Sequence, residues 1–179
     1  MPGAERSFWT QPEWIALYTK PRAEKQVYQR LLQRGLEAYL PLIRQLRQWS
    51  DRKKWIEVPL FSSYVFVRVD RKSYEAAVRT YGVVRCVWFN GRPAFIPASQ
   101  IEAIRRFIEG NVPMEVTNSG AIQPGDWVEI EEGPFRGIQG EVVQVRGKNR
   151  FVIRIDAIGA ALSVECEGWQ LRKLERVSI

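Results

Sequence analysis

The residues that could do chemistry in this chain are mostly cations and aromatic rings. The chain has no histidine, and its two cysteines, Cys86 and Cys166, stand far apart. These facts exclude Ser-His and Cys-His nucleophile pairs and leave no usual set of zinc ligands. Isolated cysteines are also typical of a reducing, cytoplasmic compartment. We therefore expect a binding protein and not an enzyme, with no metal and no cofactor.

One candidate binding surface is a strand with aromatic rings on one side. From Tyr64 to Val69 the residues alternate, so Val65, Val67 and Val69 share one face while Tyr64, Phe66 and Arg68 share the other. β-Branched and aromatic residues in this rhythm predict a strand whose valine face points to the core. The aromatic face has two explanations: it docks a partner, or a helix covers it.

The second candidate is a basic helix between Thr19 and Gly35. Ala23, Val27 and Leu31 recur every four residues and predict the buried stripe. The remaining positions are polar or basic, and Glu24 is the only acid among them. They are Arg22, Lys25, Gln26, Gln29, Arg30, Gln33 and Arg34. Such a face could follow the phosphates of a nucleic acid, or it could simply face solvent.

A third candidate is the basic stretch 44–54, which reads RQLRQWSDRKK and contains Trp49. It has no clean period, so we predict a mobile hairpin loop between two strands. Cations interleaved with tryptophan can bind nucleic acid by charge and stacking. An exposed loop beside some other binding site explains the composition as well.

The charge is unevenly divided along the chain. Residues 1–110 hold 19 Lys/Arg and 10 Asp/Glu, whereas residues 111–179 hold 8 and 10. A basic half followed by a slightly acidic half predicts a polyanionic partner for the first and a different partner for the second. A basic surface that only confers solubility is the alternative.

The elements that position these residues form two predicted domains. Residues 1–12 are a polar lead-in, and 13–109 alternate strands and helices in an α+β pattern. Residues 110–122 have no periodicity and predict a linker. Residues 123–179 contain short strands between glycine-rich turns, which predicts a small β-barrel. No apolar run reaches the ~20 residues of a membrane span, and the N-terminus lacks a signal-peptide pattern.

Several segments resemble a known family in the expected order. Pro124-Gly125-Asp126, the turn 133–137 and Gly140-Glu141-Val142 closely resemble the KOW motif of the NusG transcription factors. Upstream, residues 14–20, 60–67 and 82–84 resemble the NusG N-terminal domain. The sequence of residues 47–54 is similar to that of the specialised antiterminator paralogues of the UpxY and RfaH type. The resemblance covers about residues 13–175.

The resemblance implies a fold and a function. It implies an N-terminal NusG-like domain, an antiparallel sheet with helices, followed by an SH3-like KOW barrel. It implies a monomeric bacterial transcription elongation and antitermination factor that binds the clamp helices of the largest RNA polymerase subunit and suppresses pausing or termination. The matching polymerase-binding positions are Tyr18, Phe61, Tyr64, Phe66, Phe89 and Ile101.

The same resemblance implies contact with the displaced non-template DNA strand. The matching positions are Lys20, Arg30, Arg34, Thr80 and Tyr81, to which charge and placement add Arg22. In the second domain, the implied partner-binding residues are Phe135 and Ile158. The partner in that family is Rho or a ribosomal protein.

Two positions depart from the family pattern. Ser62-Ser63 follows Phe61 where many relatives have proline, and Ile158 stands where the general factor has phenylalanine. Isoleucine keeps apolar area but cannot stack, which favours a dedicated antiterminator over the general factor that couples polymerase to Rho or the ribosome. A ribosomal or RNA-binding KOW module is the other alternative. β-Branched residues at 151–155 favour the barrel as the resting state of the second domain.

Overall fold

The computed structural model describes residues 9–175 and has a mixed α/β fold. It divides into two compact units, Met1–Pro97 and Ala98–Ile179. Most of the predicted lead-in, residues 1–8, lies outside the described residues. The predicted first domain, 13–109, includes the helix 98–109. In the structure, that helix belongs to the second unit.

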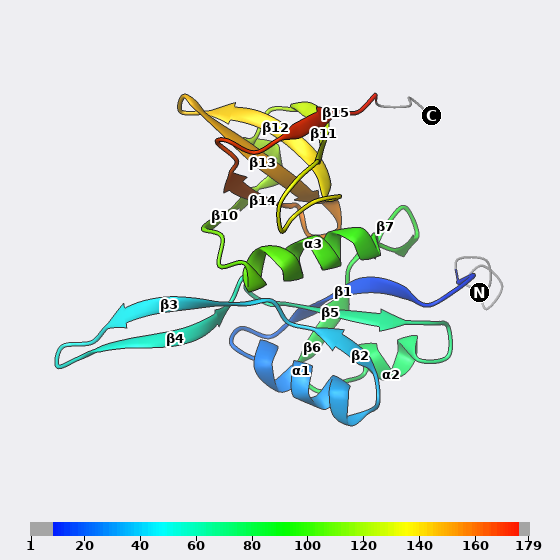
Figure 1. The fold of residues 1–179 in the computed structure, drawn as a ribbon. Coiled ribbons are helices and arrows are strands. Elements are labelled where there is room, and N and C mark those ends of the chain that lie inside the picture. The colour runs from blue at the N-terminus through cyan, green and yellow to red at the C-terminus, as the bar shows by residue number, and fades with distance from the viewer. Residues whose placement is uncertain (1–8, 176–179) are drawn as a thin grey trace. The chain divides into compact units, whose positions relative to one another are not determined.

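The first unit is built on an antiparallel sheet with strand order β2-β5-β1-β6, and β9 also pairs with β1 (Figure 1). The strands are β1 (Glu13–Thr19), β2 (Glu37–Tyr39), β5 (Tyr64–Val69), β6 (Val83–Cys86) and β9 (Phe95–Ile96). Because β5 lies between β2 and β1, it is an interior strand. The alternating segment predicted from sequence therefore lies inside the sheet.

Helices α1 (Glu24–Gln33) and α2 (Tyr74–Val78) lie on one face of this sheet (Figure 1). Val65, Val67 and Val69 are buried there with Val27 and Leu31 of α1, which confirms the predicted valine face and helical stripe. Burying one such side chain contributes roughly 1.5–3 kcal/mol, so this layer is the main support of the unit.

A long hairpin leaves the same unit. Strands β3 (Leu42–Gln48) and β4 (Lys53–Pro59) pair along their whole length from Leu42↔Pro59 to Gln48↔Lys53. The prediction of a loop over 44–54 was therefore wrong for all but the turn. The period is unclear because both faces are largely exposed, so neither face needs apolar residues. A second, short hairpin joins β7 (Trp88–Phe89) to β8 (Arg92–Pro93) through Asn90-Gly91, a dipeptide that favours tight hairpin turns.

The second unit contains α3 (Ala98–Glu109) and a six-stranded antiparallel sheet with order β10-β14-β13-β12-β11-β15. The strands are β10 (Met114–Asn118), β11 (Asp126–Ile130), β12 (Gln139–Val145), β13 (Lys148–Ile155), β14 (Ala160–Glu165) and β15 (Leu171–Lys173). Two 3-10 turns, η2 (Ser119–Ala121) and η3 (Asp156–Ile158), interrupt the strands.

The prediction of a linker over 110–122 was wrong at its centre. Strand β10 lies inside that range and pairs with β14 from Met114↔Val164 to Asn118↔Ala160. The segment has too few apolar residues to reveal itself by pattern, because its stabilisation comes from backbone pairing at the sheet edge.

Four aromatic rings pack together in the second unit. Phe107 of α3 packs against Phe135, Phe151 and Trp169, with ring centroids 5.0, 6.1 and 6.2 Å away. Gly140 on β12 makes room for this cluster, since a Cβ atom there would lie 2.6 Å from Cζ of Phe151. The glycine-rich sequence of this region thus reflects close packing as well as turns.

Candidate functional site

Two tyrosines and an arginine lie side by side on three neighbouring strands of the first unit. Tyr18 of β1 is the direct cross-strand partner of Tyr64 on β5 and of Arg85 on β6. The tyrosine ring centroids are 5.5 Å apart in an edge arrangement, and the Arg85 guanidinium lies over Tyr18 at 5.4 Å. Both tyrosines are half-buried and Arg85 is exposed. We call these three residues the tyrosine row.

A buried carboxylate fixes the turn that leads into this row. The Ser63 amide donates to Oε1 of Glu24 at 2.7 Å, and the Thr19 amide donates to the Ser63 carbonyl at 2.8 Å. Ser63 has φ 65°, an uncommon value for a residue with a side chain. The first turn of α1 therefore holds the backbone just before Tyr64 in place. This contact involves Ser62-Ser63, one of the two places where the sequence departs from the pattern that it resembles.

The other predicted polymerase-binding residues differ in exposure. Phe66 is 0 % exposed, and the ring of the buried Phe61 packs edge-on against it at 5.9 Å. Of the two explanations for the aromatic face, burial of Phe66 fits the one in which that face is covered. Ile101 of α3 is also buried. The alternation of residues 64–69 places Phe66 on the face opposite the valines. Alternation alone does not reveal that this face is covered at the centre of the sheet.

Phe89 is the most exposed of the set, at 69 %, and lies on the short β7–β8 hairpin. Its neighbour Trp88 donates from Nε1 to the Tyr74 hydroxyl at 3.0 Å, which anchors the hairpin beside α2. Among the described residues, Phe89 makes no ring contact with Tyr18 or Tyr64. The structure thus brings together only Tyr18 and Tyr64 of the six predicted positions as partly exposed rings.

A second group combines one ring with two cations. Tyr81 is 71 % exposed, and both Nζ of Lys20 and the guanidinium of Arg30 lie 5.0 Å from its ring centroid. Nη1 of Arg30 also donates to the Tyr81 carbonyl at 3.0 Å. Three of the predicted DNA-binding residues therefore converge, and we call them the tyrosine clamp.

The remaining predicted DNA-binding residues lie around this clamp in different roles. Arg22 is exposed, with φ 62°, in the turn before α1. Arg34 is exposed and donates to the Ala76 carbonyl at 3.3 Å. Thr80 is buried, and its hydroxyl donates to the same carbonyl at 3.0 Å. Thr80 thus supports the backbone before Tyr81 and offers little surface of its own.

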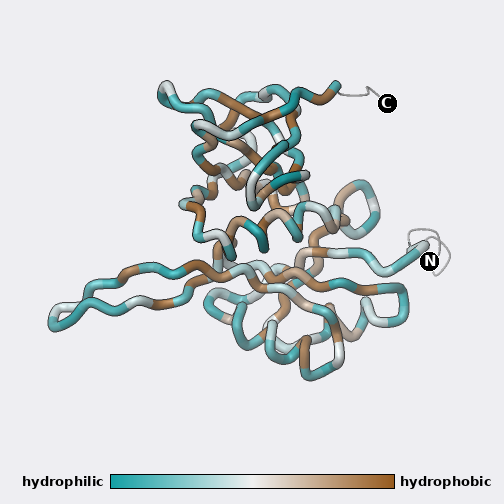
Figure 2. The backbone as a smooth tube through the Cα atoms, in the orientation of Figure 1, coloured by the Kyte–Doolittle hydropathy of each residue, from teal (hydrophilic) through white to brown (hydrophobic). Residues whose placement is uncertain are grey.

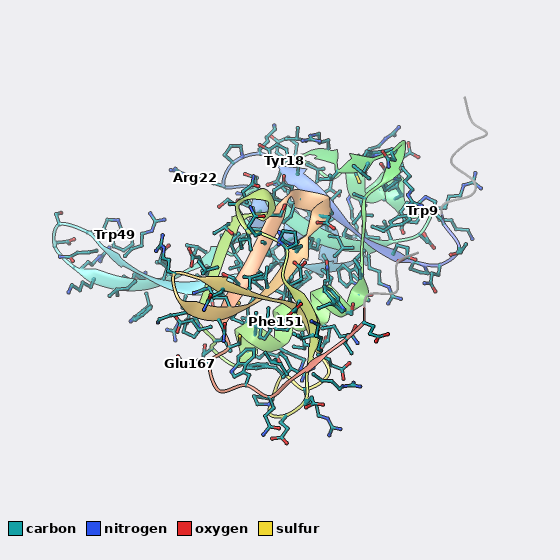
Figure 3. The ribbon with its side chains drawn as sticks, turned by 90° about the horizontal axis from the view of Figure 1, so that it is seen from above. Trp9, Tyr18, Arg22, Trp49, Phe151 and Glu167 are labelled. Carbon is teal, nitrogen blue, oxygen red and sulfur yellow. The ribbon has the colours of Figure 1, made fainter. Side chains whose placement is uncertain are left out.

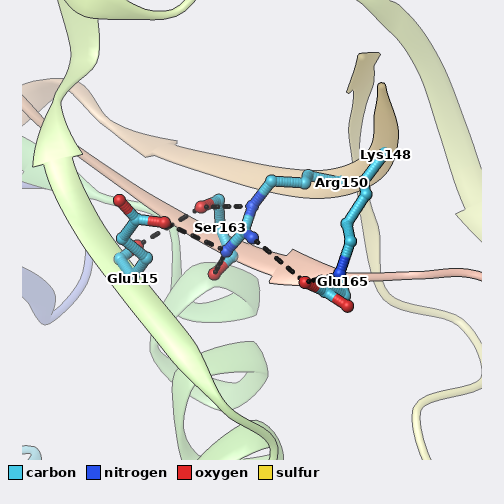
Figure 4. Close-up of polar contacts among 5 residues, drawn as sticks. All are labelled: Glu115, Lys148, Arg150, Ser163 and Glu165. Atoms are coloured by element: carbon cyan, nitrogen blue, oxygen red, sulfur yellow. Dashed lines mark hydrogen bonds and ion pairs between the residues drawn. The ribbon is translucent and has the colours of Figure 1, made fainter. Parts of the chain in front are cut away.

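In the second unit, Phe135 is buried in the aromatic cluster, with Trp169 5.6 Å away, while Ile158 is half-buried on η3. A groove of this unit, about 1020 Å³, is lined by residues of both charge signs. Arg150 there pairs with Glu115 and Glu165 and donates to Ser163, while Lys148 also reaches Glu165 (Figure 4). These charges are mutually satisfied.

Two features of many enzyme sites, a metal-binding cluster and a reactive thiol, are absent from the described residues. They contain no group of three or more His, Cys, Asp or Glu side chains placed to hold a metal ion. Burial raises the pKa of the Cys86 thiol to about 11 and also raises the pKa of Cys166, so neither is a reactive thiolate near neutral pH. In the described part of the chain, every helix is too short or too polar to cross a membrane.

Comparison with known proteins identifies the family of this chain. A family model described as "Transcription termination factor nusG" matches residues 12–105, more than half of the chain. The chain belongs to the NusG family. The tyrosine row and the tyrosine clamp both lie in the part of this NusG-family chain that the family model matches.

Individual relatives are distant. The "Transcription termination/antitermination protein NusG" of Rickettsia felis is 22 % identical over 185 residues, covering 97 % of this chain and 94 % of that protein. The protein of the same name from Rickettsia conorii is 22 % identical over 173 residues, covering 90 % of each. A solved structure titled "Domain interaction in Thermotoga maritima NusG" has a TM-score of 0.46 at 19 % identity and covers 92 % of this chain and 98 % of that one.

Sequence reasoning missed two residues of the site. Arg85 lies over Tyr18 only because β6 is the neighbour of β1, and no local signal in the sequence reveals that order. Glu24 was recognised as the lone acid of the helix, but its hydrogen bond to Ser63 depends on the same tertiary arrangement.

Proposed function

We propose that this NusG-family chain is a dedicated elongation and antitermination factor that binds RNA polymerase and the displaced DNA strand. The observation that carries the proposal is the tyrosine row, in which two partly exposed rings and an arginine lie in register on three strands. Partly exposed tyrosines beside an arginine are the residue types that dominate the binding energy of protein interfaces.

The tyrosine row is assigned to the clamp helices of the largest polymerase subunit. Tyr18 and Tyr64 provide apolar area, while Arg85 provides a cation for an acidic partner residue. Phe61 and Phe66 are buried and are assigned a supporting role beneath that surface, whereas Ile101 is buried on α3 of the second unit and remains a proposed contact. Phe89 lies on a separate hairpin and remains a proposed contact.

The tyrosine clamp is assigned to the non-template DNA strand. An exposed ring with cations beside it can stack on an unpaired base while the cations contact the phosphates on either side. Arg22 and Arg34 add charge around it. Thr80 holds the backbone that carries Tyr81.

The second unit is proposed to be the KOW barrel that recruits a further partner through the surface around Ile158. Its antiparallel sheet and its glycine-rich turn sequence support this assignment. A general factor that couples polymerase to Rho or the ribosome is the second candidate, because the relatives carry the name of a termination and antitermination protein. Ile158 instead of phenylalanine favours the dedicated factor.

The experiment measures binding of the purified chain to RNA polymerase and, in parallel, pause lifetimes in transcription reactions. The Tyr18→Ala/Tyr64→Ala double variant should weaken polymerase binding by about 2–4 kcal/mol, as the loss of interface anchors does. The matched control, Tyr18→Phe/Tyr64→Phe, keeps both rings and should bind within about threefold of the original. Unchanged affinity in the alanine variant would remove the tyrosine row from the polymerase interface.

Two further measurements separate the parts of the proposal. Arg22→Glu should reduce crosslinking to the non-template strand while leaving polymerase affinity unchanged. Templates with and without the native leader, and reactions with and without Rho, distinguish the dedicated factor from the general one. Stimulation of Rho-dependent termination on every template would favour the general factor.

A further inference from the structure

The β3–β4 hairpin carries a cluster of cations that the proposed function does not use. Five Lys or Arg side chains lie on it against two acids. They are Arg44, Arg47, Arg52, Lys53 and Lys54. Within the described part of the chain, none of these five forms an ion pair. The hairpin projects away from the five-stranded sheet of its unit, and its tube is teal to white toward the turn (Figure 2).

The strand register gathers three of these cations on one face with a tryptophan. Directly opposed residues share a face in an antiparallel pair, and residues two apart along a strand do so as well. Arg47 is opposite Lys54, and the Trp49 amide donates to the Arg52 carbonyl at 2.8 Å across the turn. Arg47, Trp49, Arg52 and Lys54 therefore form one cluster, which we call the hairpin tip.

This arrangement is unfavourable for an isolated protein. Like charges directly opposite each other destabilise a strand pair, and Arg47 opposite Lys54 is such a pair. Trp49 is 45 % exposed at the far end of the hairpin, where Figure 3 labels it. The Arg52 guanidinium lies 5.8 Å from its ring centroid. A polyanion with planar groups would neutralise the cations and cover the ring together.

The cations of α1 continue toward this hairpin. Nζ of Lys25 on α1 donates to the Glu57 carbonyl of β4 at 2.7 Å. The base of the hairpin therefore lies next to the helix that carries Arg30 of the tyrosine clamp. Lys25 thus adds a cation at the base of the hairpin.

We propose that the hairpin tip binds single-stranded DNA, with Trp49 stacking on a base and Arg47, Arg52 and Lys54 contacting phosphates on either side. The choice of DNA over RNA rests on the proposed function, whereas stacking and charge pairing rest on the hairpin alone. A single strand fits better than a duplex because only unpaired bases offer a free ring face to Trp49.

The test measures fluorescence anisotropy of a labelled 20-nucleotide oligothymidylate titrated with the full chain. Trp49→Ala and the double variant Arg47→Ala/Lys54→Ala should each weaken binding by about tenfold, since one stacked base and two phosphate contacts contribute on that scale. Trp49→Phe keeps a ring and should remain within about threefold. The double variant should also make the slope of log affinity against log salt concentration shallower by about 1.4, the change expected when two phosphate contacts to a single strand are lost.

The matched control is Arg71→Ala/Lys72→Ala, which removes the same charge from exposed positions after β5. It should change the affinity by no more than about twofold. Equal weakening by both double variants would overturn the proposal in favour of general charge attraction. Equal or tighter binding of the duplex form would overturn the stacking role, and tighter binding of an RNA of equal sequence would overturn the choice of DNA.

The two proposals fail separately. Lys20→Ala/Arg30→Ala alters the tyrosine clamp and leaves the hairpin tip intact. If that variant loses DNA affinity while the hairpin variants keep it, the hairpin proposal is wrong, and the assignment of the tyrosine clamp to DNA stands. If the hairpin variants lose DNA affinity but polymerase binding by the tyrosine row is absent, the hairpin proposal stands alone. Loss of polymerase affinity but not DNA affinity in the hairpin variants would assign the hairpin to a protein partner instead.

Discussion

The two units use the same residue types in opposite ways. In the first unit, Tyr81 lies exposed between Lys20 and Arg30, and Arg85 covers a half-exposed Tyr18. In the second unit, the rings pack against one another, and Arg154 reaches Glu141 and the carbonyls of η2 and the segment after it. Arginine and aromatic content alone therefore predicts neither binding nor architecture. The neighbours of each side chain decide between them.

The largest expected loss of stability comes from removing Arg154, an arginine that stabilises the fold of the second unit. Arg154 forms an ion pair with Glu141, whose side chain is 2 % exposed, and its other donors bind backbone carbonyls. Arg154→Met should lower the free energy of unfolding by about 3–5 kcal/mol, because it removes one partner of a buried ion pair. Urea denaturation followed by circular dichroism measures this.

Arg172→Met is the control for that change. Arg172 pairs with Glu129 and Glu131 at the surface, so its loss should cost about 0–1 kcal/mol. A similar loss of unfolding free energy in both variants would mean that Arg154 stabilises the fold no more than a surface arginine does.

A smaller effect is expected where the first unit positions its exposed ring. Gly82 follows Tyr81, has φ 101°, and a Cβ atom there would lie 2.7 Å from Cγ2 of Val27. Gly82→Ala should destabilise the chain by about 1–3 kcal/mol through strain and this close contact. Gly91→Ala, at φ 73° with open space around its Cβ, is the control for backbone strain alone. An equal cost in both variants would leave Val27 without a role in placing Tyr81.

The next effect depends on pH and concerns a buried thiol in the first unit. Burial raises the pKa of Cys86 from 9.0 to about 11, so the folded chain keeps a proton that the unfolded chain releases earlier. The resulting stability is fully present below pH 9 and is lost as the pH rises toward 11. By pH 11 the loss should be about 2 kcal/mol.

Unfolding measured from pH 8 to 11 tests this in the original chain and in Cys86→Ala. The difference between the two curves isolates the thiol from the lysines and tyrosines that also titrate. Parallel curves would show that Cys86 ionises as easily in the folded chain as in the unfolded one.

The smallest stability effect is expected at the exposed cations of the first unit. Lys20→Ala/Arg30→Ala should change the free energy of unfolding by no more than about 1 kcal/mol, because both cation–π contacts lie at the surface. Its affinity for single-stranded DNA should nevertheless fall by several-fold. Melting and anisotropy on the same sample check both results. A large loss of stability would mean that these cations stabilise the fold, as Arg154 does in the second unit.

Local pattern predicted the parts of the fold that local residues decide. The alternation at 64–69 gave the strand and its buried valine face, and Asn90-Gly91 gave a tight turn. Pattern could not give what depends on neighbours in space. It did not reveal that Phe66 is covered, that Met114–Asn118 pairs with β14, or that α3 groups with the second unit.

The same limit applies to the site. Tyr18, Tyr64, Lys20, Arg30 and Tyr81 were identified by residue type and by resemblance, but their grouping into a row and a clamp follows from strand order and helix placement. Arg85 was missed for that reason. Residue type thus predicted candidates, and tertiary structure selected among them.

The β3–β4 hairpin has a consequence for handling the protein. In the described part of the chain these strands pair only with each other, so each leaves a row of backbone amides and carbonyls open along its outer edge. Open edges template aggregation, and charged side chains along them repel a second copy. Variants that lose these cations should therefore self-associate more readily as their concentration rises, and comparisons among them belong in dilute solution.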